Sequence, residues 1–340
     1  MTARTTPHTP LPPRLSHALP LLGPGAGHWL PRLLEPVARS TREDRWHTSL
    51  LTPLRFPVEF SVASSSPHMT RYTTEFVSPD RAPATRLPAG LERLRELRLP
   101  GPDNPVTELL LRAHRCHTVV WGTWLGGRHD ARRDRFKLYV EVPKAAAVPF
   151  ERELTAHLGT RPFPLQEGRL RLVGLDLTTG GVERYYRVGA MSVSDLRGLV
   201  PEGSPGGAEA LTAALVRLVG RPFVNELPGF NVNISLAGPS LTVSGPALSW
   251  LGTDRVARRR LLDFAARSGL DLSRYAALTT ACAEHHRNHH GILALTLPPG
   301  PGVQLTIGFS PFGPAAPIRN PADWANSPST SSASSGGSPP

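Results

Sequence analysis

Two neighbouring segments of the chain carry charged side chains at alternate positions among apolar ones. PVEFS at 57–61 contains Glu59, and TRYTTEF at 70–76 contains Arg71 and Glu75. Because successive residues of a strand point to opposite faces, each segment would have one apolar and one polar face. A glutamate on the polar face could act as a general acid or base, and an arginine there could bind an anion. An ion pair of Arg71 with Glu59 or Glu75 is the alternative that needs no functional role.

Later segments that alternate in the same way add more polar side chains to this face. These residues are Lys137 and Tyr139, Arg184 and Tyr186, Asn231 and Asn233, and Gln304 and Thr306. In an open antiparallel sheet they would face water, whereas in a closed barrel they would line the interior. Tyrosines and amides accompany the charges at matching positions, which favours the barrel.

The elements that would position these side chains are helices alternating with pairs of strands. Apolar residues three and four apart predict helices near 27–39, 88–98, 105–115, 148–158, 206–219, 254–268 and 272–288. Other segments predict strands at 56–63, 70–77, 118–124, 135–142, 169–177, 182–190, 230–237, 291–297 and 303–310. Short links at 179–181 and 298–302 predict antiparallel hairpins, and no strand is followed by GxGxxG. A doubly wound nucleotide-binding fold is therefore not expected.

Composition sets further limits on the function. The formal net charge is +11 and is carried almost entirely by arginine, which indicates an anionic partner. Dense basic clusters occur only at 128–135 and 258–260, so a small anionic molecule is supported as well as a nucleic acid. The two cysteines, Cys116 and Cys282, do not build a disulfide framework, and no apolar run is long enough to span a membrane. We expect a cytoplasmic protein.

The two ends of the chain differ in composition from the rest. Residues 1–20 are rich in proline and threonine, and residues 318–340 are of low complexity. Neither segment has enough apolar residues to offset the entropy of ordering, so both are expected to be disordered. Residues 21–317 are expected to form a single domain.

The order of these segments resembles the aromatic prenyltransferases of the αββα-barrel type, and within them the dimethylallyltryptophan synthase branch. PVEFS and TRYTTEF resemble that family's first hairpin, FKLYVEVP at 136–143 resembles its K-x-Y strand, and VQLTIGFSP resembles the end of its closing hairpin. The resemblance covers roughly residues 50–312. It implies an α+β fold in which a closed antiparallel barrel of about ten strands, built from αββα repeats, is ringed by helices.

The resemblance also implies a role for each candidate residue. Glu59 would be the catalytic acid/base residue; Arg71, Lys137 and Arg184 would bind diphosphate; Tyr139 and Tyr186 would shield the allylic cation; Asn231, Asn233 and Gln304 would line the interior or contact the acceptor. The family's later strand usually reads R-x-K-x-Y, whereas the positions assigned here are Arg184, Tyr186 and Val188. Arg187 would lie on the opposite face of that strand.

The implied reaction is transfer of a dimethylallyl or longer prenyl group from a prenyl diphosphate to an aromatic acceptor such as an indole or tryptophan derivative. It would be an electrophilic aromatic substitution without an obligatory metal, although Mg²⁺ could stimulate it, and the chain has no DDxxD motif. The protein would be a monomer or homodimer that binds neither nucleic acid nor membrane. The alternatives are a non-catalytic barrel that binds a hydrophobic or anionic metabolite and a basic nucleic-acid-binding protein.

Two further motifs stay outside the predicted site. CAEHHRNHH at 282–290 has Cys and His at helical i,i+4 spacing, which could bind zinc, but a His-rich helix end can also complement the helix dipole. Trp121 and Trp124 share a face of one predicted strand and are typical of a core or rim. No metal ligand is therefore predicted.

Overall fold

Helices and pairs of strands alternate along the chain. This computed structural model describes residues 11–164, 168–188, 191–200, 206–220, 232–280, 288–300 and 302–312. The helices are α1 (Pro13–Leu22), α2 (Pro24–Leu33), α3 (Glu35–Ala38), α4 (Pro83–Glu96), α5 (Pro105–Cys116), the 3-10 helix η1 (Lys144–Ala146), α6 (Ala147–Leu158), α7 (Val193–Leu199), α8 (Gly207–Val219), α9 (Ala247–Leu251), α10 (Asp254–Ser268) and α11 (Ser273–Leu278). The strands are β1 (Val58–Ala63), β2 (Thr70–Thr74), β3 (Thr123–His129), β4 (Asp134–Glu141), β5 (Arg169–Asp176), β6 (Val182–Val188), β7 (Val232–Ala237), β8 (Ser240–Pro246), β9 (His290–Leu297) and β10 (Gln304–Phe309). Each pair of strands follows one or more helices, which is the αββα repeat.

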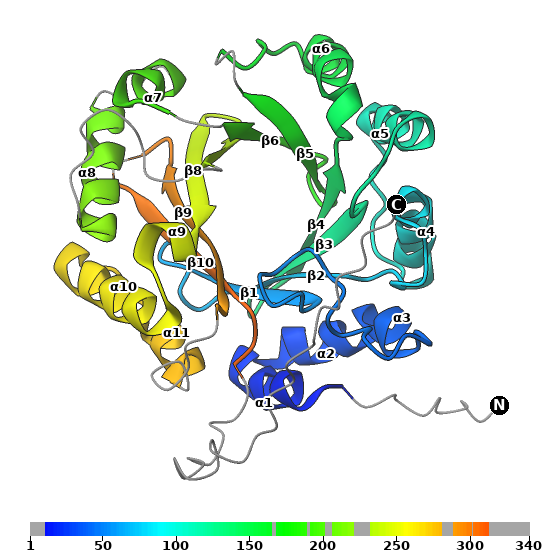
Figure 1. The fold of residues 1–340 in the computed structure, drawn as a ribbon, viewed down its shortest axis with the longest axis horizontal. Helices are drawn as coiled ribbons and strands as arrows, with labels where there is room; N and C mark the ends of the chain where they lie inside the picture. The colour runs from blue at the N-terminus through cyan, green and yellow to red at the C-terminus, as the bar shows by residue number, and fades with distance from the viewer. Residues whose placement is uncertain are drawn as a thin grey trace, which may run out of the picture.

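The strands close into one antiparallel barrel. The order around it is β1-β10-β9-β8-β7-β6-β5-β4-β3-β2, and β1 pairs with both β2 and β10. The helices lie around the outside, where α2 contacts β2 and β3, α6 contacts β5, and α8 contacts β9 (Figure 1). Closure leaves no sheet edge unpaired. The predicted α+β fold, a closed barrel ringed by helices, is confirmed.

The hydrophobic core lies outside the barrel, between the strands and the helices. In β2, in β8 and in β1 up to Val62, the outward residues are buried, whereas the alternate, inward residues keep partial exposure. Outward side chains such as Val58, Phe60 and Leu138 belong to the same core as Leu87 of α4 and Leu154 of α6. Because the core is built on the outward face, the inward face is not required to be apolar.

The N-terminal helix corrects one expectation from the sequence. Residues 11–20 were expected to be disordered, but α1 begins at Pro13 and buries Leu15, Ala18 and Leu22. Proline is well suited to a first helical position, where the backbone amide has no partner within the helix. Residues 1–10 and the predicted tail at 318–340 lie outside the described chain.

One strand is missing from the prediction and another is displaced. β8 at Ser240–Pro246 was not predicted, because serine, threonine, glycine and proline dilute its apolar alternation. β3 begins at Thr123 instead of residue 118 and continues through Arg128 to His129. The apolar run at 118–122 resembles a strand but forms the loop that precedes β3.

Buried polar groups tie the helices to the outside of the barrel. On one side, Nδ1 of His129 donates to Asp134 at 2.6 Å, and Nε2 of His129 lies 2.9 Å from the hydroxyl of Tyr72. Trp29 of α2 donates to the same Asp134 at 2.6 Å. This series of hydrogen bonds pairs polar groups that would be costly to bury without a partner.

A second series of hydrogen bonds of the same type joins α10 and α11 to β9. Nδ1 of His290 lies 2.7 Å from Asp254, and Nε2 of His290 lies 2.8 Å from the hydroxyl of Tyr275. Asp254 also accepts the backbone amides of His289 and His290 at 2.8 and 3.0 Å. These hydrogen bonds hold the pKa of Asp254 below its ordinary value although burial acts in the opposite direction.

Glu141, at the end of β4, holds the loop that precedes β3. Its carboxylate accepts the backbone amides of Val120, Trp121 and Gly122 at distances of 2.7 to 3.1 Å. These three amides have a charged acceptor and so do not need a strand partner. The loop in turn fixes where β3 begins.

We expect Glu141→Gln to lower the free energy of unfolding by about 1 to 3 kcal/mol, because a charged acceptor of several buried amides is replaced by a neutral one. Urea unfolding monitored by circular dichroism measures the change. The matched control is Glu153→Gln on α6, whose ion pair with Arg112 is exposed and whose loss should change stability by less than about 0.5 kcal/mol. Equal effects of the two variants would contradict the anchoring role of Glu141.

Candidate active site

The inward faces of β1 to β4 bring the candidate base together with several cations. Registered residues of neighbouring antiparallel strands lie on the same face, so rows of inward side chains can be followed around the barrel. One row is Glu59, Thr73, Gly126 and Lys137, and the next is Ser61, Arg71, Arg128 and Arg135. Glu59, Arg71 and Lys137 therefore share the interior, as predicted from alternation.

Arg71, Arg128, Arg135 and Lys137 form what we call the cation cluster, on three adjacent strands. Nη2 of Arg71 donates to Ser66 at 2.6 Å. The buried Nε atoms of Arg71 and Arg135 have no hydrogen-bond partner within the described chain. Burial, together with the neighbouring Arg128, lowers the pKa of Arg71 to about 10, so it remains protonated at neutral pH. The incompletely paired arginines of this cluster, in a poorly solvated interior, favour an anion.

Glu59 is a buried carboxyl with an unpaired oxygen. Its Oε2 has no hydrogen-bond partner among the described residues. Burial raises its pKa to about 8. A Cβ at either Gly291 or Gly308 would come closer than 3.0 Å to a Glu59 oxygen, so the carboxyl occupies space that only glycine leaves. A carboxyl with this pKa can exchange a proton near neutral pH.

The ion pair of Arg71 with Glu59 or Glu75, considered from the sequence, is not found in the described chain. Glu75 is instead bound by the indole Nε1 of Trp124 at 3.0 Å and lies 3.7 Å from Arg86. Arg71 lies beside Arg128, with which it is registered. Arg71 and Glu75, although close in sequence, therefore have different interaction partners.

The face of β6 that lines the barrel interior is the opposite of the one predicted. Gly174 of β5 is registered with the inward-facing Tyr139 on one side and with Glu183 on the other. Glu183, Tyr185 and Arg187 therefore face the interior. The inward face of this strand reads E-x-Y-x-R, in contrast to the R-x-K-x-Y of the family that the sequence resembles.

Arg184 and Tyr186 consequently face outward, and their predicted places in the interior are wrong. Arg184 donates to the backbone carbonyl of Arg161 at 3.1 Å. Tyr186 is fully buried and stacks on Phe163, with ring centroids 4.0 Å apart. Their predicted roles in binding diphosphate and shielding a cation cannot be carried out from the outer face.

The sequence contains the signal that distinguishes the two faces of β6. Val182 and Val188 share the parity of the outward residues and mark the apolar side. A bulge in β5, between Leu170 and Leu172, shifts the register of the β5–β6 pair by one residue. The faces of β6 are already set at the pair of Gly174 with Glu183, which this bulge does not reach, so the apolar parity of Val182 and Val188 is the signal that the sequence offers.

Glu183 is the partner of Lys137. The Lys137 ammonium forms an ion pair with Oε2 of Glu183, and Ser235 donates to Oε1 at 2.7 Å. Burial acts to raise the pKa of Glu183, but Lys137 and Ser235 outweigh it and lower the pKa. Glu183 is therefore an ionised carboxylate inside the barrel.

Two interior tyrosines lie beside this ion pair. The rings of Tyr139 and Tyr185 are 5.9 Å apart in an edge-to-face arrangement. Glycines create the room: a Cβ at Gly126 would lie 2.9 Å from the Tyr139 ring, and one at Gly174 would lie 3.1 Å from the Lys137 chain. Tyr139 is thus in the interior as predicted, and Tyr185 takes the place expected for Tyr186.

The remaining predicted residues are placed only in part. Gln304 of β10 shares the parity of Gly308, which is registered with the inward-facing Ser61 of β1, and so faces inward. Asn233 is registered with Arg187, while Asn231 lies outside the described residues. The possible acceptor contacts of all three stay predictions.

Several interior residues were not among the predicted site residues. They include Trp124, Arg128, Arg135, Glu183, Tyr185 and Arg187. Trp124 is registered with Tyr139, and its ring stacks on Trp121 with centroids 3.8 Å apart. The sequence signal for Arg128 and Arg135 is the basic cluster that flanks the β3–β4 turn, where equal spacing from the turn places both on one face.

No group of three or more His, Cys, Asp or Glu residues in the described chain is arranged to hold a metal ion. His289 and His290 of the CAEHHRNHH motif are described, whereas Cys282, His285 and His286 fall outside the described residues. Within the described part of the chain, no helix combines the length and apolar character needed to cross a membrane.

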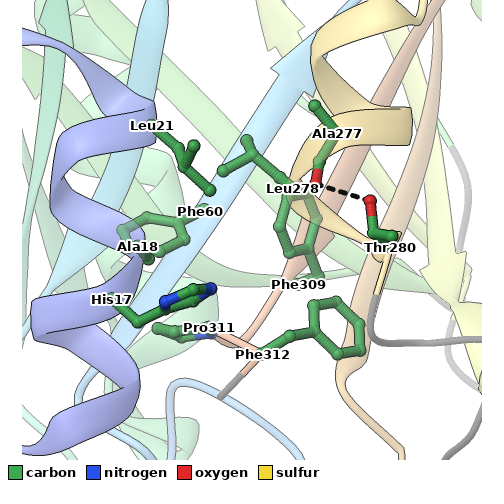
Figure 2. Close-up of a pocket in the computed structure, with 10 residues that line it drawn as sticks. All are labelled: His17, Ala18, Leu21, Phe60, Ala277, Leu278, Thr280, Phe309, Pro311 and Phe312. Atoms are coloured by element: carbon green, nitrogen blue, oxygen red, sulfur yellow. Dashed lines mark hydrogen bonds between the residues drawn. The ribbon is translucent and has the colours of Figure 1, made fainter. Parts of the chain in front are cut away.

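A small apolar cavity lies on the other side of the barrel wall. Its volume is about 50 Å³, and it is lined by residues of α1 and α11 and by outward side chains of β1 and β10 (Figure 2). Phe60, Phe309 and Phe312 line it, and His17 contributes its only titratable side chain. Figure 2 shows no charged residue among the lining side chains, and the lining residues His17, Leu21 and Thr280 are exposed, so this cavity opens at the outer surface and is not a continuation of the polar interior.

Comparison with solved structures identifies the fold. The crystal structure of a 6-dimethylallyltryptophan synthase from Micromonospora olivasterospora in complex with DMASPP and Trp superimposes with a TM-score of 0.70 at 22% identity, covering 87% of this chain and 96% of that one. A 5-dimethylallyltryptophan synthase from Streptomyces coelicolor, also with DMASPP and Trp, gives 0.72 at 18% identity over 91% and 95%. PriB with product diphosphate gives 0.67 at 18% identity over 88% and 93%.

These similarities lie in the structure and are not accompanied by a similarity of sequence to a known family. No protein-family model matches the chain, and no curated protein sequence matches it. At identities of 18 to 22% the likeness establishes the fold. The chain has the αββα-barrel fold of these aromatic prenyltransferases.

The raised pKa of Glu59 predicts a pH dependence of stability. The folded protein holds a proton on Glu59 up to about pH 8, whereas an unfolded glutamate loses it near its ordinary value of 4.5. Glu59 therefore lowers stability progressively as pH rises through this window, by on the order of 1 kcal/mol per pH unit. Relative to the wild type, Glu59→Gln should gain stability as pH rises from about 5 to about 8.

Urea unfolding of both proteins across this pH range tests the expectation. Glu43→Gln, at an exposed surface position, is the control and should show a constant difference from the wild type. A difference between Glu59→Gln and the wild type that does not change with pH would show that Glu59 titrates normally.

Proposed function

We propose that the protein transfers a prenyl group from a prenyl diphosphate to an aromatic acceptor, with an indole such as tryptophan as the first acceptor to test. The observation that carries the proposal is the combination, inside one closed barrel, of the cation cluster with a proton-holding carboxyl at Glu59. The solved structures with the same fold include complexes with DMASPP and Trp. Those ligands are a prenyl diphosphate analogue and an indole, which have the chemistry that this interior fits.

The cation cluster supports the departure of diphosphate. When the allylic carbon–oxygen bond breaks, the electron pair leaves with the diphosphate, and negative charge grows on its oxygens. Arg71, Arg128 and Arg135 are fixed on neighbouring strands and do not need to reorganise to meet this charge. Electrostatic stabilisation of the transition state by preorganised donors of this kind is the largest single contribution to the rate enhancement of many enzymes.

The aromatic side chains of the interior support the allylic cation left behind. The faces of Tyr139 and Tyr185, with Trp124 registered beside Tyr139, offer electron-rich surfaces next to the cation cluster. Each such contact stabilises a cation by about 0.5 to 2 kcal/mol. The same rings occupy space that water would need to quench the cation.

Glu59 supports the final proton transfer. Attack of the aromatic ring on the allylic carbon forms the new carbon–carbon bond and leaves a positive charge on the acceptor, which is removed when a ring proton is lost to a base. An ionised Glu59 can accept that proton, and its raised pKa makes it a stronger base than an exposed glutamate. It can also accept a hydrogen bond from an indole N–H.

We expect release of diphosphate from dimethylallyl diphosphate in the presence of tryptophan or another indole, with EDTA present, because the cation cluster supplies the charge that a metal would otherwise provide. Added Mg²⁺ should be stimulatory at most. Mass spectrometry of the acceptor identifies the product, and a panel of acceptors and longer donors defines the substrates. Donor binding without any product would support the alternative of a non-catalytic barrel.

Substitutions separate the interior from the exterior. Glu59→Gln should lower kcat/KM by about 100-fold or more, and Arg71→Gln by a similar factor. Arg184→Gln is the matched control, because Arg184 carries the same charge but lies on the outer face of β6. A loss with Arg184→Gln as large as that with Arg71→Gln would contradict the inward face assigned to β6.

The pH profile tests the base separately. Because kcat/KM reports the groups of the free enzyme, it should rise with pH and level off near the pKa of Glu59, about 8. The residual activity of Glu59→Gln should lack this rise. A profile that is flat between about pH 6 and about pH 9 would remove Glu59 from the role of base.

A further inference from the structure

Glu183 is an acidic side chain set among the cations of the interior. Both of its carboxylate oxygens are engaged, one by Lys137 and the other by Ser235. Only 14% of its side chain is exposed, and 12% of that of Lys137. The pair is therefore a built feature of the interior and not a surface ion pair of small energetic value.

The charges around Glu183 come from several strands. Lys137 faces it from β4, Tyr185 from β6 itself, and Ser235 from β7, while Tyr139 packs against Tyr185. Arg128 of β3 is near enough to be stabilised in its charged form by this carboxylate. Glu183 thus acts electrostatically on the cation cluster as well as on its direct partner.

A bound diphosphate would meet this carboxylate at close range. The ammonium of Lys137 is shared between Glu183 and any anion that approaches the cluster, and a like charge beside the anion is unfavourable. We propose that Glu183 is an internal counter-ion that holds Lys137 and weakens the grip of the cation cluster on diphosphate, which allows the diphosphate product to leave. This inference rests on the proposed function, because it assigns diphosphate to the cation cluster.

The consequence is a division of labour within the cluster. Arg71, Arg128 and Arg135 bind the anion without competition from a carboxylate in direct contact within the described interior, apart from the 3.6 Å pair of Arg135 with Asp130. Lys137 contributes to diphosphate binding only to the extent that its ion pair with Glu183 is broken. Glu183 acts through Lys137 and is a positioning residue, not a catalytic one.

The test measures binding of inorganic pyrophosphate by isothermal titration calorimetry in metal-free buffer. Glu183→Gln keeps the shape and an acceptor for Ser235 but removes the charge, and it should bind pyrophosphate about tenfold more tightly than the wild type. In steady-state assays it should show stronger inhibition by pyrophosphate, and kcat should fall if product release becomes limiting. A residue that only maintains the fold would not tighten binding.

Asp176→Asn is the matched control. Asp176 is registered with Lys137 and faces the same interior, but its carboxylate accepts the backbone amides of Thr178 and Thr179 at 2.9 Å. Asparagine can still accept these hydrogen bonds. Asp176 acts on Lys137 and Arg128 through space but forms no ion pair with either in the described chain, so its substitution removes the same charge without freeing Lys137 and should tighten pyrophosphate binding less than Glu183→Gln does.

A double-mutant cycle isolates the coupling between Lys137 and Glu183. Lys137→Met should weaken pyrophosphate binding more in the Glu183→Gln background than in the wild type, because only there is Lys137 free to bind the anion. Glu183→Asp, which keeps the charge, should resemble the wild type, and Glu183→Ala, which removes the charge, takes the place of Glu183→Gln if that variant does not fold.

The outcomes distinguish this inference from the proposed function. If the wild type binds pyrophosphate and Glu183→Gln binds it no more tightly, the counter-ion role is wrong while the diphosphate site stands. If neither the wild type nor any variant binds pyrophosphate, the assignment of diphosphate to the cation cluster is overturned, and with it both proposals.

Discussion

Closure of the barrel is the constraint on which the rest of the structure depends. Every strand has hydrogen-bonded neighbours on both sides, so the sheet has no edge to protect. The apolar residues of the strands point outward and require cover, which the surrounding helices provide. The hydrophobic core therefore lies outside the barrel. This arrangement leaves the interior free for side chains that a core would exclude, such as Glu59, Arg71 and Lys137.

Within that interior, residues of one type acquire different properties from their immediate partners. Glu59 has no partner for Oε2, and burial alone raises its pKa to about 8. Glu183 is also buried, yet Lys137 and Ser235 lower its pKa. The two glutamates thus differ at neutral pH, one mostly protonated and the other ionised. Such divergence of paired environments is how a single site comes to contain both a proton-transfer group and a fixed charge.

Much of the fold could be predicted from the sequence, because apolar alternation marks strands and short turns mark antiparallel pairs. Glu59, Arg71, Lys137 and Tyr139 could be placed for the same reason, since their strands are regular. Matching Arg184 and Tyr186 to the family's R-x-K-x-Y strand reverses the faces of β6, because Val182 and Val188 share the parity of Arg184 and Tyr186 and mark that side as the apolar one. Closure itself is not encoded in any one segment, since it depends on β1 meeting β10 across nearly the whole chain.

The same barrel can support more than one chemistry, so function depends on how its interior charges are balanced. Each cation on the inward face is available to a ligand only if it does not already form an ion pair with a neighbouring carboxylate. Arg71 meets this condition, whereas Lys137 is bound to Glu183. A carboxylate in this position reduces the net positive charge next to the anion without removing a cation. The strength with which diphosphate is held can therefore be tuned on β6, while the groups that assist its departure stay fixed on β2, β3 and β4.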